Sequence, residues 1–352
     1  MKIKIGVLVC ILFTAPIGVN AHHSFRVHYI PEQHASVSGI LTSARIRSPH
    51  SFLTVDVEGE NGEIVSWDIE THAVPMIKRM GMEADDFKIG EEITVGGFPS
   101  RIEGKALILG LDFTMADGTS YSWRPNTLVP EGGLSEADSV VTTGLDRFQG
   151  TWGYEVDPNP HINAESPLPL NQAGLDAREA FDPLDTSALR CIPPHLPSLL
   201  YVPYLYDIQI VGEELRLQHE YFEILRTVRL DGQATQVDSA NMYGTAMARV
   251  EEDAIVIEST GFSNLAAGLA SDFDQNGVGT DIPSSDQKKI TERYTVSEDG
   301  LALTAEYTIE DPVFLTETYT NSTVWKRLAD GTELVPFDCD SDMAAQSTSQ
   351  GG

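Results

Sequence analysis

Two regions of the chain alternate between hydrophobic and polar positions, which is the pattern of β-strands that bury one face. In the first region, alternating segments lie at 37–46, 52–57, 64–69, 90–97 and 106–113. A short helix is predicted at 73–80, between the third and fourth of these segments, and Gly81 ends it. Five strands with a helix in that position are the order of an OB-type barrel, so we expect an OB-like domain.

The second region predicts a longer antiparallel meander. Its alternating segments lie at 206–211, 215–222, 224–230, 245–251, 254–259, 289–297, 301–309 and 316–325, and a further strand is expected at 150–154. Tight-turn compositions such as Asp231-Gly232 join several of them. Roughly eight strands joined by short turns can close around a small ligand, so we expect a lipocalin-like barrel in a mainly β protein.

The stretch between the two regions is rich in Pro, Gly, Ser and acidic residues without a sustained period, which indicates a linker. The predicted division of the chain is a signal peptide at 1–21, an OB-like domain at 22–124, a linker at 125–147, a lipocalin-like domain at 148–340 and a disordered tail at 341–352.

The first 21 residues have the three parts of a secretory signal. Lys2 and Lys4 give a basic start, an apolar run follows, and Ala21 stands before the expected cleavage site. The apolar run is shorter than a membrane span requires. We therefore expect a periplasmic or secreted protein without membrane insertion.

The charge of the chain argues against one class of partner, and its cysteine content predicts a disulfide. Lys and Arg total 23 against 53 Asp and Glu, and the formal net charge is −30. Such a balance repels phosphate backbones, so no nucleic acid partner is expected. Cys191 and Cys339 are the cysteines that remain beyond the leader, and in an oxidising compartment they predict a disulfide.

Several motifs in the first region form a recognisable set. They are His22-His23-Ser24-Phe25, Ser48-Pro49-His50, Trp67 ahead of the short helix, and the segment at 90–97. Together they resemble a family of exported bacterial proteins of unknown function whose mature chains begin His-His-Ser-Phe. In that family an Asn-Pro-His introduces the second strand, and here Ser48 replaces the asparagine. The resemblance implies an OB-like fold and export, and it assigns no reaction.

The histidines at the start of this region suggest metal chemistry. Cleavage after Ala21 would let His22 offer its α-amine and its imidazole to one ion, as in copper histidine-brace proteins, and imidazole ligands suit copper or zinc. His50 is the second ligand that we would choose, and His23 is a further candidate. The alternative is that His22 and His23 form an exposed terminus that binds no metal.

A second set of motifs lies in the second region. They are Arg190-Cys191-Ile192-Pro193-Pro194, Arg229-Leu230-Asp231-Gly232, Thr260-Gly261-Phe262, Thr291-Glu292-Arg293-Tyr294 and Ile309-Glu310-Asp311-Pro312. This set resembles a second uncharacterised exported bacterial β-barrel domain. That domain usually carries histidines where this chain has Ile282-Pro283-Ser284-Ser285, so chemistry that depends on those histidines is not expected here.

Alternation also predicts which polar side chains point into the second barrel. Glu292 shares a face with Ile290 and Tyr294, and His219 shares one with Leu217. A buried carboxylate needs a partner, and the available cations are Arg226, Arg229 and Arg293. We assign His219, Arg229, Glu292 and Arg293 as candidate ligand-binding residues. The alternative is a structural ion pair that closes one end of the barrel.

The segment 272–281 follows the Asp-x-Asp-x-Asn-Gly pattern of calcium loops. Its candidate calcium ligands are Asp272, Asp274, Asn276 and Asp281. Pro283 stands at the twelfth position, where an EF-hand has a bidentate glutamate, so a looser loop is expected. An ordinary surface turn is the alternative.

These features favour an exported binding protein that holds a small, partly apolar ligand in its second barrel. The alternative is a copper- or zinc-binding metalloprotein that uses His22 with His50. Hydrolysis is a third hypothesis, and neither a Gly-x-Ser-x-Gly elbow nor a His-Glu-x-x-His motif occurs to support it. No catalytic residue is assigned.

Overall fold

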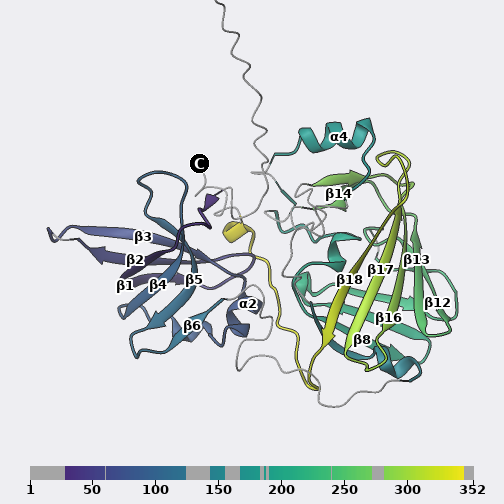
Figure 1. The fold of residues 1–352 in the computed structure, drawn as a ribbon, viewed down its shortest axis with the longest axis horizontal. Coiled ribbons are helices and arrows are strands. Elements are labelled where there is room, and N and C mark those ends of the chain that lie inside the picture. The colour runs from purple at the N-terminus through teal and green to yellow at the C-terminus, as the bar shows by residue number, and fades with distance from the viewer. Residues whose placement is uncertain are drawn as a thin grey trace, which may run out of the picture.

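The computed structural model describes residues 28–59, 61–123, 143–154, 167–182, 186–187, 190–238, 240–271 and 281–344. Two β-rich domains lie side by side (Figure 1), each built around one main sheet. The mainly β fold class predicted from alternation is therefore confirmed. In the described part of the chain, no helix has the length and apolar character needed to cross a membrane.

The first domain is a closed five-stranded barrel with one added edge strand. Its elements are β1 (Ala35–Arg45), β2 (Ser51–Glu58), β3 (Ile64–Thr71), α2 (Val74–Arg79), the 3₁₀ turn η1 (Ala84–Asp86), β4 (Glu92–Pro99), β5 (Leu107–Met115) and β6 (Ser120–Ser122). Antiparallel pairing runs in the order β3-β2-β1-β4-β5-β6, and a parallel pairing between β3 and β5 closes the barrel. The predicted helix is α2, which lies between β3 and β4 as expected.

One glycine explains how this small barrel bends. A Cβ atom added to Gly39 in β1 would lie 2.2 Å from the carbonyl oxygen of Asp56 in β2, so only glycine allows the two backbones to approach so closely. The pairing of β1 with β2 shifts register between Leu41 and Ser43, just beyond this point. β1 can therefore pair with β2 along one half and with β4 along the other.

The second domain contains a nearly closed antiparallel sheet of ten strands. Its strands are β7 (Gly150–Tyr154), β8 (Tyr206–Val211), β9 (Glu214–His219), β10 (Leu225–Arg229), β11 (Thr235–Gln236), β12 (Thr245–Glu251), β13 (Ala254–Thr260), β16 (Lys289–Val296), β17 (Ala302–Glu310) and β18 (Tyr319–Arg327). Their order is β10-β9-β8-β7-β18-β17-β16-β13-β12-β11. The count exceeds the roughly eight strands of the predicted meander because β7 inserts between β8 and β18 and the short β11 extends the edge.

Other elements lie outside this sheet. They are the helix α4 (Gln172–Glu179), the 3₁₀ turns η2 (Leu145–Phe148), η4 (Ser198–Leu200) and η5 (Tyr221–Glu223), and the two-stranded sheet of β14 (Leu265–Ala270) and β15 (Ile282–Ser284). In Figure 1, α4 and β14 lie at one end of the barrel. The sheet of β14 and β15 was not predicted, because its strands are short and lack clear alternation.

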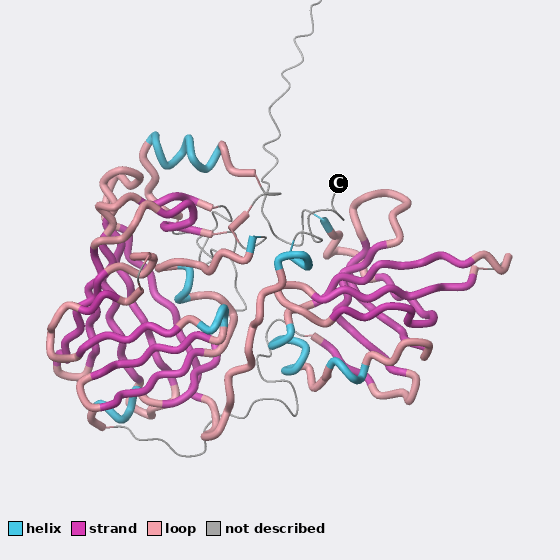
Figure 2. The backbone as a smooth tube through the Cα atoms, turned by 180° about the vertical axis from the view of Figure 1, so that it is seen from behind, coloured by secondary structure: helices cyan, strands magenta, loops and turns pink. Residues whose placement is uncertain are grey.

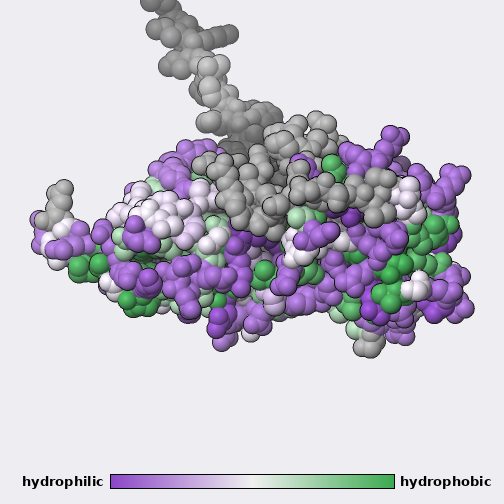
Figure 3. Space-filling view, turned by 90° about the horizontal axis from the view of Figure 1, so that it is seen from below, coloured by the Kyte–Doolittle hydropathy of each residue, from purple (hydrophilic) through white to green (hydrophobic). Residues whose placement is uncertain are grey.

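The alternation predicted for the barrel strands is visible in their burial. In β17, Leu303, Ala305, Tyr307 and Ile309 are buried, while the residues between them face outward. Hydrophilic residues cover most of the described surface on the face shown in Figure 3, with hydrophobic residues scattered between them. This distribution agrees with the net charge of −30.

After β18 the chain leaves the barrel and runs between the two domains (Figures 1 and 2). It carries Cys339, whose disulfide to Cys191 has a Cα–Cα distance of 5.9 Å, so the pairing predicted from the cysteine count is present. Residues 341–344 form a helical turn, and Asp340 accepts hydrogen bonds from the backbone N–H groups of Asp342 and Met343.

Candidate functional site

A buried ion pair lies at the centre of the second barrel. β10 positions Arg226 and β16 positions Glu292, and both side chains are fully buried. Arg226 Nη1 donates to Glu292 Oε2 at 2.9 Å, and Nη2 donates to Oε1 at 2.5 Å. Burial opposes the charge of Arg226, but the adjacent Glu292 carboxylate outweighs it and raises the arginine pKa. Arg226 therefore keeps its positive charge.

Aromatic side chains surround this pair. The Tyr294 hydroxyl donates to Glu292 Oε2 at 2.6 Å, and the Tyr206 hydroxyl donates to Tyr294 at 3.3 Å. The His219 ring stacks on Tyr206 with 4.1 Å between the ring centroids. Burial and the Arg226 charge lower the pKa of His219, so its imidazole is neutral.

Inward-facing polar atoms of the barrel strands that have no hydrogen-bond partner among the described residues include Nε2 of His219, Nε of Arg226 and Oγ of Ser259. A buried polar atom left unpaired costs about 1–3 kcal/mol, so such atoms usually meet water or a ligand group. These unpaired atoms therefore oppose the stability that the packed barrel interior provides.

The predicted ligand-binding residues divide between the two faces of the sheet. Glu292 and His219 point into the barrel, as alternation predicted. Arg229 instead pairs with Asp231 and Glu213, and Arg293 Nη1 lies 2.9 Å from Glu251 Oε2, all in partly exposed positions. Arg226 is the arginine that joins Glu292, because in β10 it faces inward and Arg229, three residues later, faces outward.

A buried lysine marks one end of the barrel. Lys288 Nζ donates to the carbonyl oxygens of Leu196 at 3.1 Å and Gly268 at 2.8 Å, and it lies 4.1 Å from the centroid of the Phe262 ring. Its side chain joins β14 and the segment before η4 to the barrel end. Burial lowers its pKa to about 7, and the carboxylate of Asp311 opposes this shift.

Sequence reasoning did not select Lys288, although a signal exists. It precedes Ile290 and Glu292 by two and four residues, so the period of a strand places it on the same inward face. It lies just before β16, outside the alternating segment at 289–297 that predicts this strand.

Asp311 connects the motif at 309–312 to Ser285 at the same end. Its Oδ2 accepts from the Ser285 N–H at 2.7 Å, and its Oδ1 accepts from the Ser285 hydroxyl at 2.9 Å and from the Val313 N–H at 3.1 Å. Asp311 is 2% exposed, so this junction is a rigid part of the barrel end.

A surface cleft of about 660 Å³ opens beside Lys288 and Asp311. Its lining residues come from three segments far apart in the sequence. They are Thr260, Gly261, Asp286, Gln287, Lys288, Lys289, Glu310, Asp311, Pro312, Leu315, Thr316, Glu317 and Thr318. The motif residues 260–261 and 310–312 thus lie on one cleft, together with the turn that leads into β16.

Further buried polar groups lie in the segments at this end. Burial and the neighbouring Lys288 lower the pKa of His195 to about 4, so the imidazole is neutral at pH 7. Its ring centroid is 6.4 Å from that of Tyr243, whose hydroxyl donates to the carbonyl of Pro194. Nδ1 of His195 and the hydroxyls of Ser198 and Ser284 find no hydrogen-bond partner in the described part of the chain.

The first domain carries a separate polar cluster around Glu70. His50 Nδ1 lies 2.7 Å from Glu70 Oε1, and the Tyr29 hydroxyl donates to Glu70 Oε2. The His50 side chain is 38% exposed, whereas that of Glu70 is 8% exposed, so the carboxylate holds the ring at the surface. Burial lowers the pKa of the nearby His28, with Glu70 opposing the shift, and it lowers the pKa of His72 to about 3.

Only some of the residues predicted to bind a metal lie in the described part of the chain. His22, His23, Asp272, Asp274 and Asn276 lie outside the described residues, as do the leader and most of the predicted linker. Asp281 is described, and its Oδ2 accepts from the backbone N–H and the hydroxyl of Ser187 at 2.8 and 2.7 Å. Within the described ranges, no group of three or more His, Cys, Asp or Glu side chains is arranged to hold a metal ion.

Residues 10–109 match the sequence model of a family of unknown function, DUF6152. The match spans β1 to β4 and the start of β5, and it stops before the second domain. It agrees with the resemblance to a family of unknown function in this region. No curated protein matches the chain.

Proposed function

We propose that the second domain binds a small, partly apolar ligand in the cleft at the end of its barrel. The observation that supports this is the convergence of residues 260–261, 286–289 and 310–318 on one cleft of about 660 Å³. A cleft of this size lies in the usual range for small-molecule sites. Leu315 and Pro312 supply apolar contacts, while Lys289 and Glu310 supply charges that can orient a polar group.

The proposal places the ligand in the cleft because large side chains fill the barrel interior. Arg226, Tyr294, Tyr307 and Trp325 are among the largest fully buried residues. The barrel then serves as a rigid support, and Asp311 and Lys288 fix the segments that line the cleft. Sites that are held by rigid elements bind with less loss of conformational entropy.

The test uses the apolar dye 8-anilinonaphthalene-1-sulfonate as a probe of the cleft. Thr318 is exposed and lines the cleft, so Thr318→Trp places a large side chain in the cleft without disturbing the core. We expect this variant to weaken dye binding at least tenfold, whereas Ser322→Trp, on the exposed face of β18, leaves it unchanged. Equal dye binding by both variants and the parent protein would contradict the proposal.

A second candidate function, copper or zinc binding in the first domain through His22 and His50, has one supporting observation. Glu70 orients the His50 ring through a 2.7 Å contact at Nδ1. Carboxylates commonly orient metal-binding histidines in this way. Imidazole donors and an N-terminal amine suit copper or zinc.

The metal proposal is tested by mapping the mature N-terminus by mass spectrometry and titrating the protein with copper(II). We expect one tight site that His50→Ala weakens at least tenfold. His34→Ala is the matched control, because His34 is also exposed and also contacts a carboxylate, that of Asp112. A mature chain that does not begin at His22, or equal titrations of both variants, would contradict this assignment.

A further inference from the structure

The segment 335–340, here called the strap, is held by two carboxylates of the second domain. Glu220 Oε1 accepts from the backbone N–H of Val335 at 2.9 Å. Glu223 Oε1 accepts from the N–H groups of Phe337 and Asp338, the latter at 3.1 Å. Phe337 is fully buried, so this half of the strap is part of the second domain's core.

The other half of the strap contacts the first domain. The N–H of Asp340 donates to the carbonyl oxygen of Ser48 at 2.8 Å, and Cys339 forms an isolated β-bridge with Ser48. The Ser48 hydroxyl in turn accepts from the N–H of Val74 at the start of α2, at 3.3 Å. The strap therefore spans the junction between the two domains.

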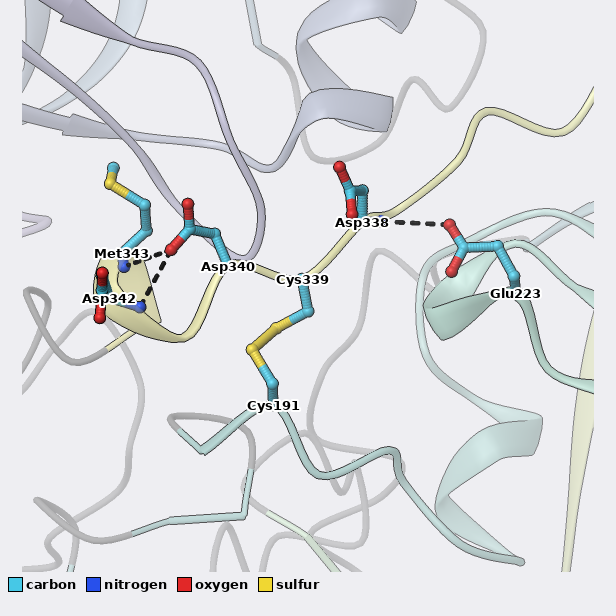
Figure 4. Close-up of a disulfide and its surroundings, with 7 residues drawn as sticks. All are labelled: Cys191, Glu223, Asp338, Cys339, Asp340, Asp342 and Met343. Carbon is cyan, nitrogen blue, oxygen red and sulfur yellow. Dashed lines mark hydrogen bonds between the residues drawn. A yellow bond between two sulfur atoms is a disulfide. The ribbon is translucent and has the colours of Figure 1, made fainter.

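The disulfide lies at the midpoint of this connection. Figure 4 shows Cys339 bridged to Cys191, with Glu223 on one side of it along the strap and Asp340 on the other. Both cysteines are only partly buried. Cys191 and Asp338 have φ angles of +52° and +46°, which residues other than glycine rarely adopt. One bridged residue and one residue beside the bridge thus have unfavourable backbone conformations.

We infer that the Cys191–Cys339 disulfide is a redox-sensitive clasp that fixes the strap against the first domain. One thiolate of a dithiol reductant attacks a sulfur of the bridge, and its second thiol then displaces that sulfur. Two electrons and two protons pass to Cys191 and Cys339, and the reductant closes to a cyclic disulfide. Residues 339–344 then leave Ser48, while Glu220 and Glu223 retain the first half of the strap, up to Asp338.

The disulfide lies where its reduction affects both domains. Ser48 lies two residues before His50, whose ring contacts Glu70 in the first domain. Cys191 lies four residues before His195, in the segment whose Leu196 carbonyl binds Lys288. Opening the clasp therefore loosens the loop that carries His50 and the segment that covers the end of the second barrel. This effect does not require a bound ligand.

The test compares hydrogen–deuterium exchange in the oxidised protein and in protein reduced by dithiothreitol without denaturant. A mass increase of two hydrogen atoms, measured before exchange, is the check of reduction. We expect at least tenfold faster exchange in peptides covering 339–344 and 46–50. Peptides from β16 and β17 should exchange at unchanged rates, which shows that the barrel remains folded. The variant Cys191→Ser/Cys339→Ser should reproduce the reduced pattern.

Two results would overturn the inference. One is reduction that leaves exchange in 339–344 and 46–50 unchanged. The other is a bridge that dithiothreitol does not reduce in the folded protein. Because the wild-type chain is reduced after folding, the test does not depend on whether the double variant folds.

Discussion

Arg226 and Glu292 form a two-point ion pair inside the second barrel, and neither side chain is exposed to solvent. They belong to β10 and β16, which are far apart in the order of the sheet, so the pair spans the barrel interior. Taking two charges out of water costs about as much as their attraction returns, so the pair contributes more to a defined geometry than to stability. Removal of either charge would nevertheless leave the other buried without a partner, which is strongly destabilising.

The first prediction follows from this interdependence. Glu292→Gln leaves the Arg226 guanidinium buried without a counter-charge, and breaking a buried pair in this way costs about 3–5 kcal/mol. Arg226→Met/Glu292→Met removes both charges and should cost markedly less than the single change. The free energy of unfolding is measured in urea through the fluorescence of Trp152 and Trp325, which are buried in the same barrel.

The control for this prediction is an exposed pair on the same barrel. Arg249 Nη1 lies 2.6 Å from Glu258 Oε1, with both side chains more than two-fifths exposed. Glu258→Gln should change the free energy of unfolding by less than about 1 kcal/mol. If Glu292→Gln lowers the free energy of unfolding as little as Glu258→Gln does, the buried Arg226 does not depend on Glu292 for its counter-charge.

Alternation predicted the inward direction of Glu292 and His219, because the two-residue period of a strand does not depend on the rest of the fold. It could not select Arg226 from the three available arginines. That choice depends on which strand faces β16 across the barrel, and local sequence does not contain this information. The contact between Arg79 of the first domain and Glu220 of the second is of the same kind.

The order of strands in the first domain was also readable from the sequence, since clear alternation and Gly81 mark its elements. The short β11, β14 and β15 were not predicted, because a strand of a few residues gives no measurable period. The cleft depends on three segments that only the closed barrel brings together. Its residues could be recognised as motifs, but their shared location could not be derived.

The second prediction concerns the pH dependence of stability. Burial lowers the pKa of Lys288 from its usual 10.5 to about 7. Between these values the unfolded chain binds a proton that the folded chain does not, so the free energy of unfolding rises with pH by about 1.4 kcal/mol per unit. Below pH 7 both states are protonated and this contribution no longer changes. Lys288→Met should lack the rise.

Chemical denaturation of the parent and the Lys288→Met variant at pH 7 and pH 9 tests this prediction. The stability of the parent relative to the variant should increase by about 2–3 kcal/mol over that interval. Lys289→Met is the matched control, because Lys289 is the exposed next residue. A parent–variant difference that is constant between pH 7 and pH 9 would show that Lys288 titrates normally.

The third prediction concerns acid stability of the first domain. Burial lowers the pKa of His72 from 6.5 to about 3, and its ring lies 4.5 Å from that of Trp123. Below pH 6.5 His72 is protonated in the unfolded chain but stays neutral in the folded chain. The free energy of unfolding therefore falls with decreasing pH until about pH 3. His72→Phe keeps an aromatic ring beside Trp123 and removes this loss.

The measurement is urea unfolding at pH 7 and pH 5, followed by the fluorescence of Trp67 and Trp123. The variant should gain about 2 kcal/mol relative to the parent on going from pH 7 to pH 5. His34→Phe, at a position where the side chain is 55% exposed, should show no comparable gain. Parallel acid sensitivity of His72→Phe and the parent would contradict the assigned cause.

The fourth prediction addresses the junction between the domains. Arg79 at the end of α2 pairs with Glu220, and both side chains are almost completely buried. Glu220 also accepts from the N–H groups of Leu205 and Val335, so one carboxylate joins the first domain, the second domain and the strap. Arg79→Met would leave that carboxylate buried without its cation, at a cost of about 3–5 kcal/mol.

Lys78 provides the control, because it is the neighbouring residue on α2 and pairs with Glu83 at 3.2 Å in an exposed position. Lys78→Met should change stability by less than about 1 kcal/mol. Hydrogen–deuterium exchange adds a local readout: Arg79→Met should accelerate exchange around 203–206 and 335–338, and Lys78→Met should not. If the two variants behave alike, Arg79 does not hold the domains together, and the strap with its disulfide would be the main connection between them.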